Sequence, residues 1–308
     1  MSILCDITTL EQCPLPDLQR KILASEFAVS HIQPDAHARI VWNNLSSPSP
    51  TPTEFALVYL HGFTANHLEG HPLHINIAHH FGMNAYLSRF DKHGTTAEDF
   101  KQLTCRGLIE SARKALAIGR RIGKRVILMG SSTGASLSLY LAARHKEVAG
   151  LILYSPLVDF YDWRVRALTY SPLNNAASKL AGSTYWIDKR DSIDANQKIW
   201  YNYYPLNGVL ELAKFVQQYM IHSEFAKITQ PIFTGYYYKN RAEKDNVVSV
   251  KAIQSMVAHV STPRNQNIHH AFPNAGSHVI NSPLTSGCLP ELYMRTEKFI
   301  SDTVSVKR

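Results

Sequence analysis

The clearest pattern along the chain is an alternation of short apolar runs with longer amphipathic stretches. Each run is continuous rather than alternating in polarity, which is typical of strands covered on both faces of a sheet. Strands separated by helix-length segments are typical of βαβ units. The pattern therefore predicts an α/β fold with a mostly parallel central sheet flanked by helices. The four clearest runs are residues 56–60, 85–87, 126–129 and 151–154.

Helical periodicity and turn residues predict the remaining elements. Helices are expected where apolar residues recur at spacings of three and four, and short β-branched runs predict further strands. Two segments near the N-terminus, residues 27–31 and 38–42, are predicted to form an antiparallel edge pair. The expected helices are residues 98–118, 133–145, 247–260 and 290–301, and the expected late strands are residues 232–238 and 268–272.

Residues 161–230 interrupt this rhythm, because roughly seventy residues lie where a single crossover helix would suffice. We expect an inserted helical cap (lid) here, between two parts of one α/β core at residues 27–160 and 231–308, with residues 1–26 as an N-terminal extension. Aromatic side chains are frequent in the insertion and suit the walls of an apolar pocket. The alternative is that these rings fill the insertion's own small core. They include Tyr161, Trp163, Tyr170, Tyr185, Trp186, Trp200, Tyr201, Tyr203 and Tyr204.

Composition excludes several classes of protein. With 308 residues, 45% hydrophobic and 18% charged, the chain is neither disordered nor in need of metal or disulfide crosslinks. Lys and Arg exceed Asp and Glu by 32 to 24. However, the densest basic stretch, residues 119–125, has no interleaved aromatics and is more typical of a helix C-terminus than of a nucleic-acid surface.

The four cysteines are dispersed and lack zinc-site spacing, which favours a reducing compartment. The chain also has no secretory leader pattern and no apolar run of membrane-spanning length. We therefore predict a cytoplasmic protein without an integral membrane segment and without a nucleic-acid partner.

The strongest chemical signal follows the third apolar run, where residues 130–134 read Gly-Ser-Ser-Thr-Gly. This is G-x-S-x-G between a predicted strand and a predicted helix, the context in which the pattern marks a nucleophile. The glycines two residues on either side leave room for a sharp turn, so the frame selects Ser132 rather than Ser131. The alternative is a tight glycine turn with a helix-capping serine.

A serine hydroxyl needs a base to accept its proton and an acid to orient that base. In this strand-turn-helix context the expected chain order is Ser, acid, His. His278 lies in a loop after the last predicted strand and is our candidate base. The alternatives, His269 and His270, lie within the strand itself.

The candidate acid is Asp245, in the loop after the penultimate strand and just before a predicted helix. Glu243 lies two residues away, and Asp159 follows an earlier strand, so both remain alternatives. Capping of the following helix would also account for Asp245 and would not exclude a catalytic role.

A tetrahedral oxyanion requires two preorganised N–H donors. The amide of Thr133, next to the nucleophile, is one candidate. The amide of Phe63, in the His-Gly-Phe-Thr loop after the first run, is the other. His61 in that loop is expected to form structural hydrogen bonds.

No cofactor or metal is predicted. His67, His71 and His74 are spaced to share one helix face, but Glu69 would face elsewhere, so a convergent ligand set is lacking. Nucleotide-binding glycine loops are missing, and Cys105 within a helix is typical of a small buried hydrophobe.

Taken together, residues 61–63 and 130–134 with Asp245 and His278 resemble the α/β-hydrolase superfamily. The chain is similar to its capped esterase and lipase branch, the monoacylglycerol-lipase and serine-aminopeptidase-like group, over residues 27–301. Residues 91–94, Asp-Lys-His-Gly, resemble that group's aspartate-glycine turn in a shortened form.

The resemblance implies a lid between the sixth and seventh main strands and a serine hydrolase that cleaves a carboxylic ester through an acyl-enzyme. The aromatic insertion favours an apolar acyl group or an aromatic acid in a small-molecule ester. A thioesterase or acyltransferase with the same residues, or a non-catalytic binding protein with this fold, are the alternatives. The sequence does not fix the oligomeric state.

Overall fold

The computed structural model describes residues 7–43, 50–179, 181, 184–187 and 199–306. Within these ranges the predicted α/β fold is confirmed: a seven-stranded sheet has the order β1-β3-β2-β4-β5-β8-β9, and every neighbouring pair except β1 with β3 is parallel. The strands are β1 (Arg39–Val41), β2 (Thr53–Leu60), β3 (Asn84–Leu87), β4 (Gly123–Ser131), β5 (Val148–Tyr154), β8 (Ile232–Tyr236) and β9 (Asn267–Ala271).

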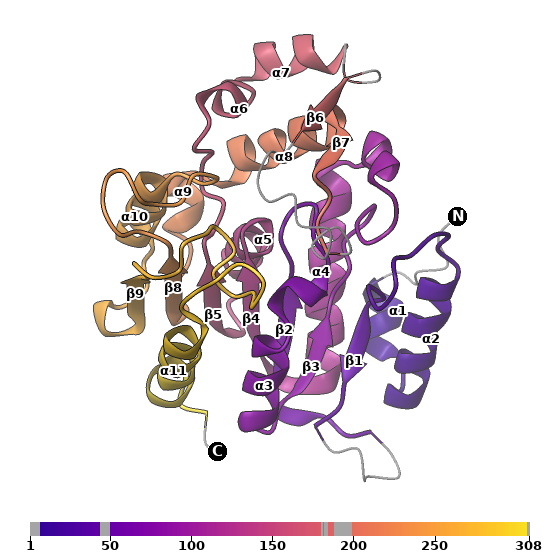
Figure 1. The fold of residues 1–308 in the computed structure, drawn as a ribbon. Coiled ribbons are helices and arrows are strands. Elements are labelled where there is room, and N and C mark those ends of the chain that lie inside the picture. The colour runs from indigo at the N-terminus through magenta and orange to yellow at the C-terminus, as the bar shows by residue number, and fades with distance from the viewer. Residues whose placement is uncertain (1–6, 44–49, 180, 182–183, 188–198, 307–308) are drawn as a thin grey trace.

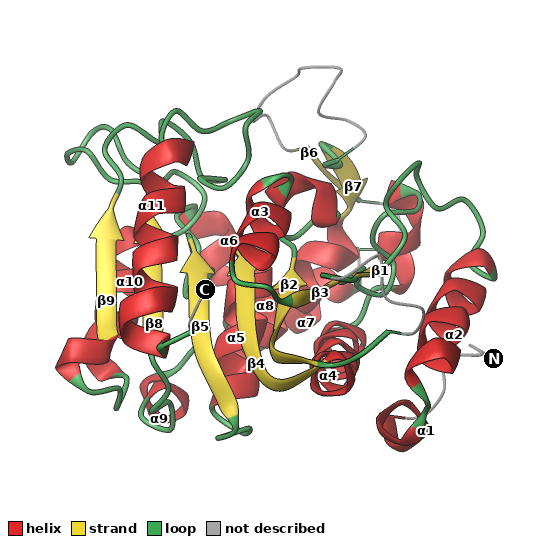
Figure 2. Ribbon diagram, turned by 90° about the horizontal axis from the view of Figure 1, so that it is seen from below, coloured by secondary structure: helices red, strands yellow, loops and turns green. Residues whose placement is uncertain are grey.

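Helices cover both faces of this sheet (Figures 1 and 2). Alternate residues of β2 show why its apolar run is continuous, because Val58 belongs to one core cluster and Leu57 to the other. The first cluster packs against α2 (Leu15–Phe27), α4 (Cys105–Ile122), α5 (Thr133–Ala142) and α10 (Val250–His259). The second packs against α3 (Leu73–His80) and α11 (Leu289–Phe299). Shorter helices are α1 (Ile7–Gln12), η1 (His67–Gly70), η2 (Ala97–Gln102), η4 (Arg264–Gln266) and η5 (Ile300–Val304).

The predicted antiparallel edge pair is wrong. Residues 27–31 form no strand, because Phe27 is the last residue of α2 and the following residues turn. The segment predicted as 38–42 does contain a strand, β1, but it pairs antiparallel with β3, far along the chain. The helix predicted over 98–118 is divided into η2 and α4, so Cys105 is the first residue of a helix rather than an interior one.

Between β5 and β8, the elements at residues 163–178, 185–187 and 203–205 lie above the parallel sheet in Figure 1, whereas the short helix at residues 222–225 lies beside α10. Besides the expected helices this part of the chain contains a two-stranded antiparallel sheet, which the aromatic pattern did not predict. Its elements are α6 (Trp163–Ala167), α7 (Ser171–Ser178), β6 (Tyr185–Ile187), β7 (Tyr203–Pro205), α8 (Leu206–Tyr219) and α9 (His222–Phe225).

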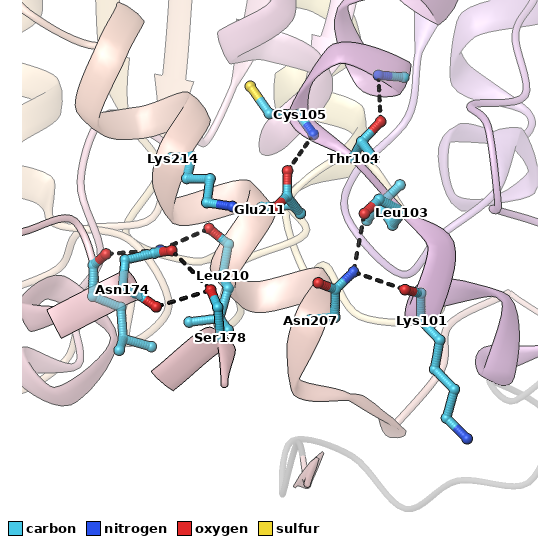
Figure 3. A network of polar contacts seen from close by, with 12 residues as sticks. Lys101, Leu103, Thr104, Cys105, Asn174, Ser178, Asn207, Leu210, Glu211 and Lys214 are labelled. Carbon is cyan, nitrogen blue, oxygen red and sulfur yellow. Dashed lines mark hydrogen bonds and ion pairs between the residues drawn. The ribbon is translucent and has the colours of Figure 1, made fainter. Parts of the chain in front are cut away.

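Helix α8 is joined to the core by side-chain hydrogen bonds (Figure 3). Asn207 Nδ2 donates to the backbone oxygens of Phe100, Lys101 and Leu103, at 3.0, 3.2 and 3.0 Å. Glu211 Oε2 accepts a hydrogen bond of 2.8 Å from the amide of Cys105 at the start of α4. These contacts fix the insertion above η2 and α4. None of the helices in the described ranges has an apolar stretch long enough to cross a bilayer.

Candidate active site

Ser132 occupies a strained turn between β4 and α5. Its backbone has φ 50° and ψ −113°, in the left-handed region that non-glycine residues rarely adopt. The flanking glycines are needed for close packing: a Cβ atom on Gly134 would lie 1.9 Å from the Leu60 carbonyl oxygen, and one on Gly130 would lie 2.5 Å from the Ala135 nitrogen. The turn is thereby pressed against the end of β2, which places Ser132 at the carboxyl edge of the sheet.

The structure distinguishes the two serines of the turn. Ser131 Oγ donates a 3.1 Å hydrogen bond to Asn281 Oδ1 and is fully buried. Ser132 is 8% exposed and serves as the N-cap residue of α5, but its side chain makes no capping hydrogen bond. The alternative of a capping serine therefore has no support in the geometry.

Asp245 and His278 are brought together, as their order in the chain predicted. His278 Nδ1 lies 2.7 Å from Asp245 Oδ2. The other carboxylate oxygen, Oδ1, accepts hydrogen bonds from the amides of Val247 and Val248 at 2.8 and 3.0 Å. Asp245 is buried, and these two donors fix the orientation of its carboxyl group. This contact assigns the ring N–H to Nδ1, as the donor to the carboxyl group, and directs Nε2 away from Asp245.

The loop that carries His278 is attached directly to the serine turn. Asn281, three residues further along, accepts the hydrogen bond from Ser131 Oγ described above. The base loop and the candidate nucleophile are therefore held at the same edge of the sheet.

The alternative acids have other partners. Glu243 is exposed and pairs with Lys239. Asp159 forms an ion pair with Arg166 at 2.8 Å. The helix-capping explanation of Asp245 is also wrong, because Ser249 is the N-cap residue of α10.

The alternative bases lie on β9, as predicted. His269 is exposed, and His270 Nε2 is 3.1 Å from Glu291 Oε1 on α11. His270 is therefore engaged with the neighbouring helix.

The loop after β2 carries the candidate oxyanion donor Phe63. The preceding amide, that of Gly62, is occupied, because it donates to Glu69 Oε1 at 2.5 Å. His61 is fully buried, its Nε2 accepts from the amide of Phe90 at 3.1 Å, and its Nδ1 is 2.9 Å from the Gly62 oxygen. Burial holds the pKa of His61 well below its usual value, so the ring is neutral and structural, as expected.

The second candidate donor, the amide of Thr133, belongs to the first residue of α5. Amides in the first turn of a helix have no partner within the helix and point toward its N-terminal end. That position suits stabilisation of a developing negative charge.

The three histidines predicted to share a helix face do not lie on one helix. His67 is in η1, His74 is in α3, and His71 lies between them. Burial lowers the pKa of both His67 and His74 to about 3, which keeps these rings neutral. In the described ranges no group of three or more His, Cys, Asp or Glu side chains is arranged to hold a metal ion.

An aromatic cluster connects the loop after β2, which carries Phe63, to the insertion. The Phe63 ring lies 5.1 Å from that of Phe100 and 5.6 Å from that of Tyr204, which β7 contributes. Tyr201 completes the cluster, with its ring 5.4 Å from Phe100. Part of the aromatic content of the insertion thus faces the candidate site. Tyr161, Trp163, Tyr170 and Tyr203 are instead exposed.

The chain is similar in sequence and in fold to known lipolytic enzymes. A thermostable monoacylglycerol lipase from Bacillus sp. (strain H-257) is 28% identical over 103 residues, which cover 33% of this chain and 41% of the lipase. No protein-family model matches the chain.

Two solved structures illustrate the likeness in fold. One comes from the work on LipS and LipT, two metagenome-derived lipolytic enzymes; its TM-score is 0.68 at 14% identity, over 88% of this chain and 99% of that one. The other, a soluble variant of monoglyceride lipase from Saccharomyces cerevisiae, has a TM-score of 0.61 at 12% identity, over 86% and 92% of the two chains. With its parallel sheet, its strained serine turn and these neighbours, the chain is an α/β-hydrolase-fold protein that resembles the esterases and lipases of that superfamily.

Proposed function

We propose that this protein is a serine hydrolase that cleaves a carboxylic ester through an acyl-enzyme intermediate on Ser132. The observation that carries the proposal is the Asp245–His278 pair, held beside the strained Ser132 turn by the Ser131–Asn281 hydrogen bond. A buried acid, a histidine whose Nδ1 faces that acid and a serine whose side chain makes no capping hydrogen bond are the parts that nucleophilic acyl transfer requires. The ester-cleaving neighbours support the same class of reaction.

In the first half of the reaction, Ser132 Oγ forms a bond to the ester carbonyl carbon while its proton passes to His278 Nε2. The carbonyl oxygen becomes an oxyanion, which accepts hydrogen bonds from the amides of Phe63 and Thr133. Collapse of this intermediate breaks the bond to the alkoxide, which takes the proton from His278 and leaves as the alcohol.

In the second half, water attacks the acyl-enzyme with His278 again as the base. The second oxyanion collapses, the proton returns to Ser132 Oγ, and the carboxylic acid is released. Asp245 orients His278 and stabilises the imidazolium that forms twice in the cycle, because its Oδ2 lies 2.7 Å from His278 Nδ1 and its Oδ1 is held by two backbone amides.

We further propose that residues 161–230 act as a cap that forms part of the acyl pocket. The cluster of Phe63, Phe100, Tyr201 and Tyr204 supports an apolar acyl group or an aromatic acid as the preferred substrate. Activity highest on acetyl esters and falling with every longer chain would contradict this preference. A cytoplasmic location remains a prediction from the sequence.

Fluorophosphonate labelling followed by peptide mapping tests the nucleophile without a choice of substrate. We expect one label per chain, on Ser132 and not on Ser131. The label should disappear in His278→Ala and persist in His270→Ala, a matched histidine that contacts Glu291 instead. A folded wild-type protein that takes no label on Ser132 would reject the mechanism.

A further inference from the structure

Glu69 is a buried carboxylate that the mechanism above does not use. It lies in η1, is 1% exposed, and receives hydrogen bonds from three different parts of the chain. Its Oε1 accepts from the Gly62 amide at 2.5 Å and from the Tyr59 hydroxyl at 3.1 Å. Its Oε2 accepts from Trp200 Nε1 at 3.2 Å. Burying a carboxylate is costly unless its environment stabilises it, so its retention here calls for an explanation.

The contacts of Glu69 extend to the serine turn and the base loop. The Tyr59 hydroxyl, which donates to Glu69, accepts a 2.9 Å hydrogen bond from Asn281 Nδ2. Asn281 in turn accepts from Ser131 Oγ. One network of side chains thus joins the oxyanion loop, the loop of His278 and the residue next to Ser132.

Glu69 also joins the oxyanion loop to the insertion. In addition to the Trp200 contact, the amide of Tyr201 donates a 3.1 Å hydrogen bond to the carbonyl of Thr64, the residue after Phe63. Tyr204 then packs edge-on against the Phe63 ring. The last part of the insertion before α8, residues 200–204 (the returning segment), therefore contacts the loop that would hold the oxyanion.

We propose that Glu69, as a carboxylate, is a positioning residue that fixes the Gly62–Phe63 turn for oxyanion binding and ties this turn to Trp200 of the insertion. The inference rests on the proposed ester hydrolysis. By holding the Gly62 amide, Glu69 leaves the next amide, that of Phe63, to face the substrate. Gly62 itself has little room for a side chain, since a Cβ atom there would lie 3.1 Å from Glu69 Oε2.

The surroundings of Glu69 give it a proton affinity that matters near neutral pH. Burial raises the pKa of its carboxyl group to about 7, although its hydrogen bonds act in the opposite direction. Tyr59 of β2 stays protonated, because burial raises the pKa of its hydroxyl well above the usual value.

The histidines around this carboxyl group do not offset its charge. His61, His67 of η1 and His74 of α3 remain neutral, because burial lowers their pKa values. His278, three residues before Asn281, is the titratable group of the base loop. In the part of the chain that the structure describes, no cation forms an ion pair with Glu69.

Protonation of Glu69 would disrupt the network. If Oε1 is protonated, its O–H group meets the Gly62 N–H. If Oε2 is protonated, its O–H group meets the Trp200 N–H. In both cases two hydrogen-bond donors face each other. Activity should therefore require two deprotonated groups, Glu69 and His278. Log(kcat/KM) then falls toward a slope of about 2 on the acid side, rather than the slope of about 1 that a single base gives.

The test compares Glu69→Gln with Glu211→Gln, using p-nitrophenyl butyrate followed at the isosbestic point of p-nitrophenol. Glu211 is a matched control because its carboxylate also receives a backbone amide, that of Cys105, away from the site. We expect Glu69→Gln to reduce the acid-limb slope to about 1, and to lower kcat at pH 8 about 10- to 100-fold with KM within about 3-fold. Glu211→Gln should keep the wild-type slope. A wild-type slope of about 1, or an unchanged slope in Glu69→Gln, overturns the proposal.

Trp200→Phe decides the question if Glu69→Gln does not fold. It removes one donor to the Glu69 carboxylate, so the acid-limb midpoint should move up by about 0.5 pH unit. Trp42→Phe is the matched control, since Trp42 donates to Gln19 far from the site, and it should leave the midpoint in place. An unmoved midpoint in Trp200→Phe rejects the role of Glu69. Fluorophosphonate labelling of the wild type separates the two proposals: an unlabelled Ser132 rejects ester hydrolysis itself, whereas a labelled Ser132 with an unaltered acid limb rejects only Glu69.

Discussion

The serine turn and the returning segment of the insertion meet at the same sheet edge but are held in place by different forces. The turn is fixed by backbone geometry, since Gly130 and Gly134 allow β4, α5 and the end of β2 to approach within contact distance. Residues 200–204 are held by the Trp200 indole N–H, by the Tyr201 amide, which donates to the Thr64 carbonyl, and by ring contacts. The serine turn tolerates almost no change in backbone shape. The position of residues 200–204 depends instead on which of the groups that hold it are charged or protonated.

Under the proposed function, this difference separates the part of the molecule that carries the nucleophile from the part that would contact the acyl group. A nucleophile must keep its position within fractions of an ångström, which close-packed backbone provides. The insertion is joined to the core by polar side chains at Asn207 and Glu211 (Figure 3) and at Trp200, and also by apolar side chains of α8 such as Leu212 and Phe215, which belong to the first core cluster. The comparison can be tested from both sides.

The largest effect on activity is expected from Asp245→Asn, which changes the partner of His278 beside the serine turn. The amide cannot stabilise the imidazolium and permits the wrong tautomer of His278, so kcat should fall about 10⁴-fold with little change in KM. Steady-state ester hydrolysis measures this loss. Asp159→Asn is the control, because Asp159 pairs with Arg166 instead. A similar loss in both variants would show that Asp245 has no special role.

The next largest effect is expected from Gly134→Ala, which tests whether backbone contact fixes the turn. The added Cβ would lie 1.9 Å from a carbonyl oxygen that cannot move without displacing β2. We expect the free energy of unfolding to fall by at least about 3 kcal/mol, measured by urea denaturation.

Gly107→Ala is the matched control for this substitution in a helix. Its new Cβ would meet the side chain of Asp91, which can rotate away. A change within about 1 kcal/mol is expected there. Equal losses in the two variants would mean that the close approach at Gly134 does not determine the fold of the turn.

On the side of the insertion, Asn207→Ala removes the donor that satisfies three backbone oxygens of the core. We expect a loss of about 1–3 kcal/mol in the free energy of unfolding. KM for a butyrate ester should rise a few-fold while kcat stays within about 2-fold, because the serine turn is untouched. A fall in kcat with an unchanged KM would show that α8 and the serine turn are not independently held.

The same difference explains what the sequence could predict. The strands β2, β3, β4, β5, β8 and β9 and the serine turn are encoded locally, by apolar runs and by glycines within five consecutive residues, and the structure has them as expected. The contact between Glu211 and Cys105 joins positions 106 residues apart, and no sequence pattern near either residue predicts it. The sequence likewise predicts no partner for Glu69, because its donors come from β2, the loop after β2 and the insertion.

The edge pair failed for a related reason. Residues 27–31 contain apolar side chains, but pairing depends on which neighbour the sheet offers, and β3 takes that place beside β1. The aromatic composition of the insertion also predicts only part of its structure. It predicted apolar walls, yet the rings divide between those that contact Phe63 and Phe100 and those that face solvent.

The smallest effect is expected from Trp163→Ala, which separates these two sets of rings. Trp163 is 74% exposed at the start of α6, so its removal should change the free energy of unfolding by no more than about 0.5 kcal/mol. The kcat/KM for a butyrate ester should also stay within about 2-fold, because an exposed ring lies outside the proposed acyl pocket. Tyr204→Ala is the counterpart: this ring is 3% exposed and contacts both Phe63 and Phe100, so about 3 kcal/mol should be lost. If Trp163→Ala instead raised KM as strongly as Tyr204→Ala, the exposed rings of the insertion would belong to the substrate pocket. Exposure would then not separate the rings of the pocket wall from those of the surface.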